Sequence, residues 1–290
     1  ILDTVFSDLG VQTHIAGIEK ADVPHGFYDL AIGNPPYGEY MTLETRKVGY
    51  ANWSIHNYFF GKAVDLVRPG GLIVFVTSKF TMDSQSLTHR KWLDAHAEML
   101  GAVRLPRNAF KKQANTEVVT DIIVMRKRAV PMFKDRPDWL EVGHAPEGML
   151  EDGQALTHYD SYQRKTVEHS RPINRWYVER PHLVIGKLRL ESCQYGRREL
   201  SPVFSGSDED FARKLDDCVL CMPKDCYQPA VITEPVSSSP SLVLERVEAT
   251  SRVRPGAFVV DNKGRICISE GEAWVNVDAA YKGLARERLL

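Results

Sequence analysis

The chain has 290 residues, with 37 Lys and Arg against 38 Asp and Glu, so its net charge is −1 at pH 7. This balance excludes a polycation that would hold nucleic acid through charge alone. An apolar content of 43% with 26% charged residues is typical of globular domains. No apolar run is long enough to span a membrane, and five cysteines fit a reducing compartment, so we expect a soluble cytoplasmic protein.

Residues 15–128 alternate between strand-like and helix-like apolar patterns. Arg68-Pro69-Gly70-Gly71 is expected to end the first helix, because Pro cannot continue a helix and Gly allows a left-handed exit. The alternation predicts an α/β fold, a partial Rossmann-like sheet that is doubly wound and mostly parallel. Strands are expected at 29–33, 72–77, 101–105 and 118–125, and helices at 54–67 and 84–99.

The composition changes after Arg128. Residues 129–170 are rich in Pro, Gly, Asp and Glu and predict a loop-rich linker. Residues 171–290 predict an α+β extension, with a helix pair near Trp176 and Leu183, a linker at 235–240 and a hairpin turn at 261–264. The chain begins with Ile1 rather than Met and enters a fold-like segment at once, so we interpret it as a fragment of a longer polypeptide.

The most informative residues are Asn34-Pro35-Pro36-Tyr37, directly after the first predicted strand. A simple bend is the plain interpretation, but ligands of open α/β sheets bind at the carboxyl ends of strands. The prolines stiffen the backbone, so that the Asn34 side-chain oxygen and the Pro35 carbonyl can both accept from one exocyclic amino group. Two acceptors would localise the nitrogen lone pair for attack on a methyl donor, and Tyr37 would stack on a planar base.

Residues 27–38 resemble motif IV of amino-methyltransferases that use S-adenosylmethionine (SAM), especially the gamma-class N6-adenine DNA methyltransferases. The similarity continues through Ser54-Ile55-His56-Asn57-Tyr58, the Arg68–Gly71 turn, Val103-Arg104-Leu105-Pro106 and residues 115–123, as in the large methyltransferase–helicase polypeptides of phages and mobile elements. The resemblance implies that residues 1–128 are the C-terminal half of a methyltransferase catalytic domain. It implies DNA as the partner and a helicase region in the same parent polypeptide.

The resemblance also implies roles for individual residues. Asn34, Pro35, Pro36 and Tyr37 would hold the target adenine, flipped out of the duplex, and Phe110 would stack on its other side; an ordinary core aromatic is the alternative for Phe110. Glu19, with Asp22 as second choice, would contact the adenine of SAM, unless either is a solvated loop charge. The glycine-rich SAM loop of the family is missing before Asn34, so the fragment is expected to bind SAM poorly and to be inactive alone.

Several alternatives stay open. The same turn serves methylation of RNA bases and of protein glutamine, and the segment could instead be an inactive DNA-binding part of a larger polypeptide. Nine Lys or Arg against four Asp or Glu between Arg90 and Arg128 fit either a DNA backbone or a solvated face. His56 and His89 have no evident catalytic partner, and no metal site is expected from Cys218, Cys221 and Cys226, because a fourth ligand at zinc-like spacing is lacking.

Overall fold

The structure is a computed structural model. It describes residues 16–21, 23–38, 40–42, 44, 48–114, 116–132, 137–152, 157–160, 164–168, 171–192, 198–229, 246–248, 253–254, 257–269 and 273–276. The described residues form two compact units, residues 1–230 and residues 231–290, which are treated separately below. None of the described helices is both long enough and apolar enough to cross a bilayer.

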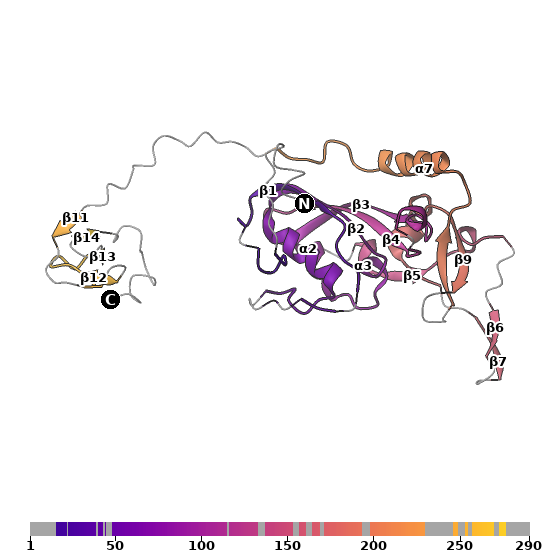
Figure 1. The fold of residues 1–290 in the computed structure, drawn as a ribbon, viewed down its shortest axis with the longest axis horizontal. Coiled ribbons are helices and arrows are strands. Elements are labelled where there is room, and N and C mark those ends of the chain that lie inside the picture. Colours follow the sequence, from indigo (N-terminus) through magenta and orange to yellow (C-terminus); the bar gives the residue numbers. More distant parts are fainter. Residues whose placement is uncertain are drawn as a thin grey trace. The chain divides into compact units, whose positions relative to one another are not determined.

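A four-stranded sheet forms the centre of the first unit (Figure 1). The strands are β1 (Tyr28–Gly33), β2 (Val67–Ser78), β3 (Ala97–Leu105) and β4 (Thr120–Lys127), in the spatial order β1-β2-β4-β3. β1 runs parallel to β2, whereas β4 is antiparallel to both β2 and β3. The α/β class is therefore confirmed. The sheet is mixed, because β1, β2 and β3 run in one direction and β4 alone runs in the other. In its described residues the connection from β3 to β4 contains only the four-residue helix α5 (Lys111–Ala114), and it returns the chain as an antiparallel neighbour of β3.

Two expected boundaries were wrong. β2 begins at Val67, immediately after helix α2 (Ile55–Leu66), so the Pro-Gly-Gly sequence lies inside the strand. Gly70 has a φ of +79°, and the pairing of β1 with β2 shifts register here, so the strand is irregular at this point without ending. The helix expected at 84–99 is α4 (Thr88–His96), preceded by α3 (Phe80–Asp83), because Ala97 already pairs with β4.

α2 contributes Phe60, Ala63 and Val64 to the core beneath the sheet, where they join Ile73 and Ile123. The same core includes buried residues from well beyond residue 128, among them Trp139, Tyr177 and Leu188. The segment expected as a loop-rich linker thus contains packed structure.

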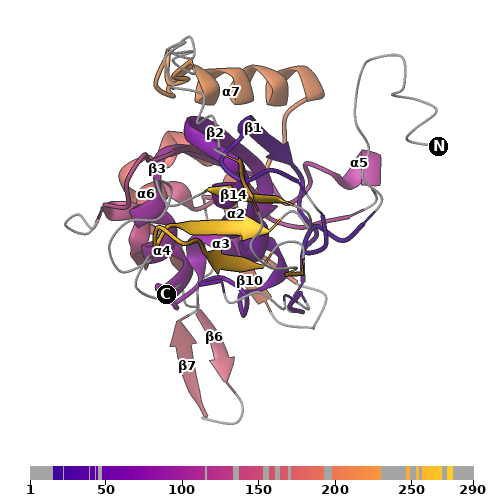
Figure 2. The same cartoon turned by 90° about the vertical axis from the view of Figure 1, so that its left-hand side faces the viewer.

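The longest of the remaining helices in the first unit is α7 (Asp208–Leu220), with 13 residues, and α5 (Lys111–Ala114) and α6 (Arg175–Glu179) are short. The described residues also form 3₁₀ turns at Asp138–Leu140, Glu147–Met149 and Pro181–Leu183. Three antiparallel pairs complete the unit as described: β5 (Val142–His144) with β8 (Pro172–Asn174), β6 (Thr157–Asp160) with β7 (Lys165–Glu168), and β9 (Lys187–Ser192) with β10 (Arg198–Val203). Figure 2 shows β6 and β7 side by side as an antiparallel pair of strands. The predicted helix pair corresponds to α6 and the turn at Leu183.

The second unit contains an antiparallel sheet with the order β11 (Arg246–Glu248), β14 (Ala273–Asn276), β13 (Ile266–Ser269), β12 (Phe258–Val260). The predicted hairpin is confirmed. Asp261 Oδ1 accepts from the backbone N–H groups of Lys263 and Arg265, at 2.9 Å each, and Gly264 has a φ of +72°. The linker expected at 235–240 lies outside the described residues.

Candidate functional site

The Asn-Pro-Pro-Tyr turn leaves the carboxyl end of β1, as the sequence predicts. Pro35 is buried, Tyr37 is half-buried, and Asn34 and Pro36 are exposed. The Tyr37 hydroxyl donates a hydrogen bond of 2.5 Å to Asn34 Oδ1 and lies 3.5 Å from the Val76 carbonyl oxygen of β2. Burial raises the pKa of Tyr37 to about 12, so the hydroxyl keeps its proton and remains a donor. This contact fixes the direction of the Asn34 side chain.

A cavity of about 630 Å³ opens beside this turn, within the size range of small-molecule sites. The motif reaches it through Tyr37 and Gly38. Segments far apart in the sequence supply the other walls, which are Ser54, His56, Asn57, Ser78, Lys79, Phe80, Ser84, Arg107, Glu117, Val118, Val119 and Glu199.

Most charged groups of the cavity wall are paired. Lys79 Nζ lies 2.8 Å from the Glu199 carboxylate, and Arg107 Nη2 lies 3.3 Å from that of Glu117. A hydrogen bond from Lys111 lowers the pKa of Glu117, so this carboxylate is ionised at neutral pH. The cavity wall therefore has polar groups but little net charge. Such a wall suits an uncharged planar ligand better than a free ion.

Phe80 is an aromatic of this cavity that the sequence interpretation missed. Its side chain is 55% exposed although it is large and apolar, and it lies on the short helix α3. Phe110, the predicted stacking residue, is half-buried against the core and is not among the lining residues. An exposed aromatic at the mouth of a polar cavity is a surface on which a base can stack. A signal was available in the sequence, because Phe80 directly follows the predicted strand 72–77 and its polar end Ser78-Lys79.

A polar cluster at the start of α2 was also missed. Asn57 Nδ2 donates to Ser54 Oγ at 3.0 Å, and Ser54 Oγ lies 3.2 Å from His56 Nε2. His56 and Asn57 are each only 5% exposed, yet all three residues line the cavity. Burial lowers the pKa of His56 to about 4, so its ring is neutral at physiological pH.

The predicted cofactor residues are not brought to this cavity. Glu19 is half-buried in the turn at 18–20, where its carboxylate lies over Gly17, and Asp22 lies outside the described residues. Among the described residues β1 pairs with β2 alone, and Leu30 and Ile32 on this strand are 46% and 71% exposed. The described residues thus contain the Asn-Pro-Pro-Tyr turn but no glycine-rich cradle for SAM, and they do not fit the cofactor as a whole.

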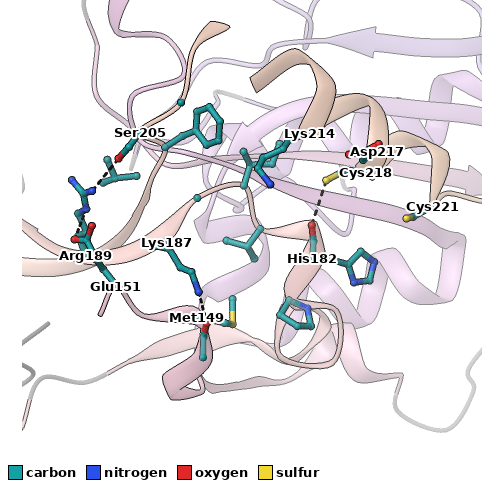
Figure 3. A pocket seen from close by; sticks show the side chains of 18 residues that line it. Met149, Glu151, His182, Lys187, Arg189, Ser205, Lys214, Asp217, Cys218 and Cys221 are labelled. Carbon is teal, nitrogen blue, oxygen red and sulfur yellow. Dashed lines mark hydrogen bonds and ion pairs between the residues drawn. The ribbon is translucent and has the colours of Figure 1, made fainter. Parts of the chain in front are cut away.

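A second cavity, of about 780 Å³, lies in the later part of the first unit (Figure 3). In its wall Arg189 forms an ion pair with Glu151 and donates to Ser205 Oγ at 3.0 Å, while Lys187 Nζ donates to the Gly148 carbonyl at 2.7 Å.

Two cysteines, Cys218 and Cys221, line this second cavity. The Cys218 thiol donates to the His182 carbonyl at 3.5 Å, and burial raises its pKa. Cys218 is buried, Cys221 is exposed and Cys226 is half-buried, and all three are free. In the part of the chain that the structure describes, no group of three metal-ligating side chains is found.

Comparison with known proteins places the first third of the chain near methyltransferases. Residues 11–103 match the Eco57I restriction-modification methylase family. A stretch of 116 residues is 31% identical to Defense against restriction protein B of Escherichia phage P1, covering 39% of this chain and 5% of that protein. Another of 111 residues is 30% identical to the rRNA N(6)-adenosine-methyltransferase metl-5 of Caenorhabditis elegans, covering 37% and 47%. The chain therefore spans less than half the length of either relative.

Solved structures give weaker similarities. The M protein of the type I restriction enzyme EcoKI is 12% identical, with a TM-score of 0.34, over 66% of this chain and 47% of that one. A putative class I SAM-dependent methyltransferase from Listeria monocytogenes is 20% identical, with a TM-score of 0.29, over 38% and 34%. These overlaps are too loose to support an argument about the site.

Proposed function

We propose that this chain carries the acceptor side of a methyltransferase that modifies the N6 amino group of adenine in DNA. The observation that carries the proposal is the position of Tyr37 and Gly38, which follow the stiff Asn34-Pro35-Pro36 turn and line a cavity of about 630 Å³. The match of residues 11–103 to a restriction-modification methylase family supports it.

The role of Asn34 follows from its hydrogen bond to Tyr37. A side-chain carbonyl oxygen has two lone pairs, so Asn34 Oδ1 can accept from the Tyr37 hydroxyl and from one amine hydrogen together. The Pro35 carbonyl would accept the second amine hydrogen. Held by two acceptors, the amine turns its lone pair toward the methyl donor, and the nitrogen loses a proton after it gains the methyl group.

The methyl donor that the family implies is SAM, which supplies an activated methyl group on sulfur. The residues that the structure describes provide only the acceptor side, so no residue here is assigned to SAM binding beyond the expectation for Glu19 and Asp22. The target base would leave the duplex to reach the cavity, with Tyr37 as a stacking surface. A helicase region in the same polypeptide remains a prediction.

The second candidate function is the same methyl transfer, with adenine in RNA instead of DNA as the acceptor. The 30% identity to an rRNA adenosine methyltransferase favours an adenine in RNA as the alternative acceptor. RNA adenines are accessible in unpaired loops, so this reading needs no base flipping.

Methyl transfer from tritiated SAM separates the two candidates. The complete natural polypeptide that contains this sequence is incubated with duplex DNA or with unpaired RNA of the same sequence, and the products are digested to nucleosides. We expect label in N6-methyldeoxyadenosine, formed about 10²–10³-fold more slowly with Asn34→Ala. Label in RNA alone would favour the second candidate, and label in neither polymer would overturn the proposal.

A further inference from the structure

Three buried polar atoms of residues that line this cavity have no hydrogen-bond partner among the described residues, namely Arg107 Nε, His56 Nδ1 and Asn57 Oδ1. The last two lie on neighbouring residues that are each only 5% exposed. Buried polar atoms are nearly always paired with protein, water or ligand. Two unpaired atoms on neighbouring residues that line one cavity therefore indicate a place where a ligand completes the hydrogen bonding.

The cluster around His56 determines which role its Nδ1 can take. Ser54 Oγ accepts from Asn57 Nδ2 and accepts no backbone N–H of α2, so the assignment of its own hydroxyl hydrogen depends on its neighbours. Donation of that hydrogen to His56 Nε2, 3.2 Å away, gives a continuous chain of hydrogen bonds from Asn57 through Ser54 to His56. The alternative, donation from Nε2 to Ser54, would leave the serine hydrogen without an acceptor.

In this chain of hydrogen bonds the imidazole hydrogen lies on Nδ1. The ring is neutral, because burial keeps its pKa at about 4, and the positive end of the α2 dipole also disfavours an imidazolium here. His56 lines the cavity and therefore carries one N–H donor that an acceptor such as a ring nitrogen would pair.

We propose that His56 Nδ1–H donates a hydrogen bond to a ring nitrogen of the target base beside the reacting amine, N1 or N7 of adenine. The inference rests on the proposed function and adds a specificity-determining residue to it. Ser54 and Asn57 are positioning residues that hold the imidazole as a donor. With the amine taken by Asn34 and Pro35, this third contact fixes the rotation of the base in its plane. Contact with N1 would also reject guanine, whose N1 carries a hydrogen.

Base analogues in the DNA test this contact. Duplexes with adenine, 1-deazaadenine or 7-deazaadenine at the target position are compared as substrates of the complete natural polypeptide. We expect kcat/KM to fall roughly tenfold to a hundredfold with the analogue that lacks the contacted nitrogen. His56→Phe should lower kcat/KM on adenine by a similar factor and show no further loss with that analogue.

Two variants separate this role from a structural one. Asn places its Nδ2–H near the position of the histidine Nδ1–H, so His56→Asn should recover part of the discrimination. His96→Phe is the matched control, because His96 stacks on Trp92 at the end of α4 and does not line the cavity, so its discrimination should equal that of the wild type. If thermal unfolding shows that His56→Phe does not fold, Ser54→Ala replaces it and should weaken the discrimination by releasing the ring.

The outcomes distinguish the two proposals. Equal rates on adenine and on both analogues, or full discrimination in His56→Phe, would overturn the role of His56 and leave adenine methylation standing. Absence of methylation on adenine itself would overturn both.

Discussion

The two edges of the central sheet differ in what covers them. The β3 edge is closed, because Arg104 of this strand forms a backbone bridge with Val184, and Trp176 Nε1 donates to the Ala102 carbonyl at 3.1 Å. At the β1 edge, none of the described residues forms a strand that pairs with the outer side of β1, and Leu30 and Ile32 are exposed. The Asn-Pro-Pro-Tyr turn leaves the sheet from this uncovered strand.

Buried charges reinforce the closed edge. Arg104 forms a bidentate pair with Asp121 at 2.8 and 2.9 Å and reaches Asp83 at 2.6 Å, and Asp83 in turn accepts from the Asn174 backbone N–H. Burial opposes the charge, but the two carboxylates raise the pKa of Arg104 above its ordinary value. The buried ion pairs thus lie on the β3 side of the sheet, whereas the Asn-Pro-Pro-Tyr turn leaves from the β1 side.

Removal of the buried cation is the largest expected effect. Arg104→Met leaves the carboxylates of Asp121 and Asp83 buried without a neighbouring cation and should lower the free energy of unfolding by about 3–5 kcal/mol. Urea denaturation of residues 1–290 measures this loss. Arg175→Met is the control, because Arg175 is 52% exposed and its ion pairs are worth about 1 kcal/mol or less. Equal losses in the two variants would contradict the contrast between the edges.

At the β1 side the largest effect is on turnover. Asn34→Ala removes one of the two amine acceptors and should lower kcat about 10²–10³-fold, as loss of one preorganised polar contact does in other enzymes. The affinity for SAM and the free energy of unfolding should stay near normal, because Asn34 is exposed and its proposed role concerns the acceptor and not the methyl donor. A lost affinity for SAM in equilibrium dialysis would show that its role is assigned wrongly.

Tyr37→Ala should weaken retention of the flipped base by about 1–3 kcal/mol, since the stacking surface is lost. The fluorescence of 2-aminopurine at the target position reports this, because an unstacked base is brighter. Tyr37→Phe keeps the ring and removes the hydroxyl with its contacts to Asn34 Oδ1 and the Val76 carbonyl, so it should retain the base but lower kcat. An unchanged signal in Tyr37→Ala would exclude stacking on this ring.

Two buried histidines, His56 and His89, should make the free energy of unfolding depend on pH. Burial lowers the pKa of His56 and of His89 to about 4 from 6.5, so the unfolded chain takes up protons at a higher pH than the folded one. The free energy of unfolding should therefore fall as the pH drops from 6.5 to about 4, by up to about 1.4 kcal/mol per pH unit for each histidine. His89→Gln should reduce this slope, and a slope that is the same in both proteins would exclude a buried neutral His89.

The smallest change in the free energy of unfolding is expected for a substitution on the exposed face of β1. Ile32→Ser changes a side chain that is 71% exposed and should alter the free energy of unfolding by no more than about 0.5 kcal/mol in residues 1–290. A loss of 2 kcal/mol or more would mean that another part of the chain covers this face of β1.

Local patterns in the sequence predicted the strands around the motif, helix α2 and the hairpin at 261–264, because apolar periodicity and turn residues act over short distances. The antiparallel β4 was not predicted, since strand direction depends on how β2, β3 and β4 pair in space. The positions of Phe80, Glu199 and Arg107 in one cavity depend on the same long-range packing. The unpaired atom of His56 could be recognised only from its burial, which the sequence does not report.

A crystal structure of the complete natural polypeptide with target DNA and a non-reactive SAM analogue tests the central claim most directly. The predicted result is an extrahelical adenine with its N6 nitrogen about 3 Å from both Asn34 Oδ1 and the Pro35 carbonyl oxygen, and with its ring on Tyr37. An adenine bound elsewhere, with Asn34 engaged by Tyr37 alone, would contradict the account.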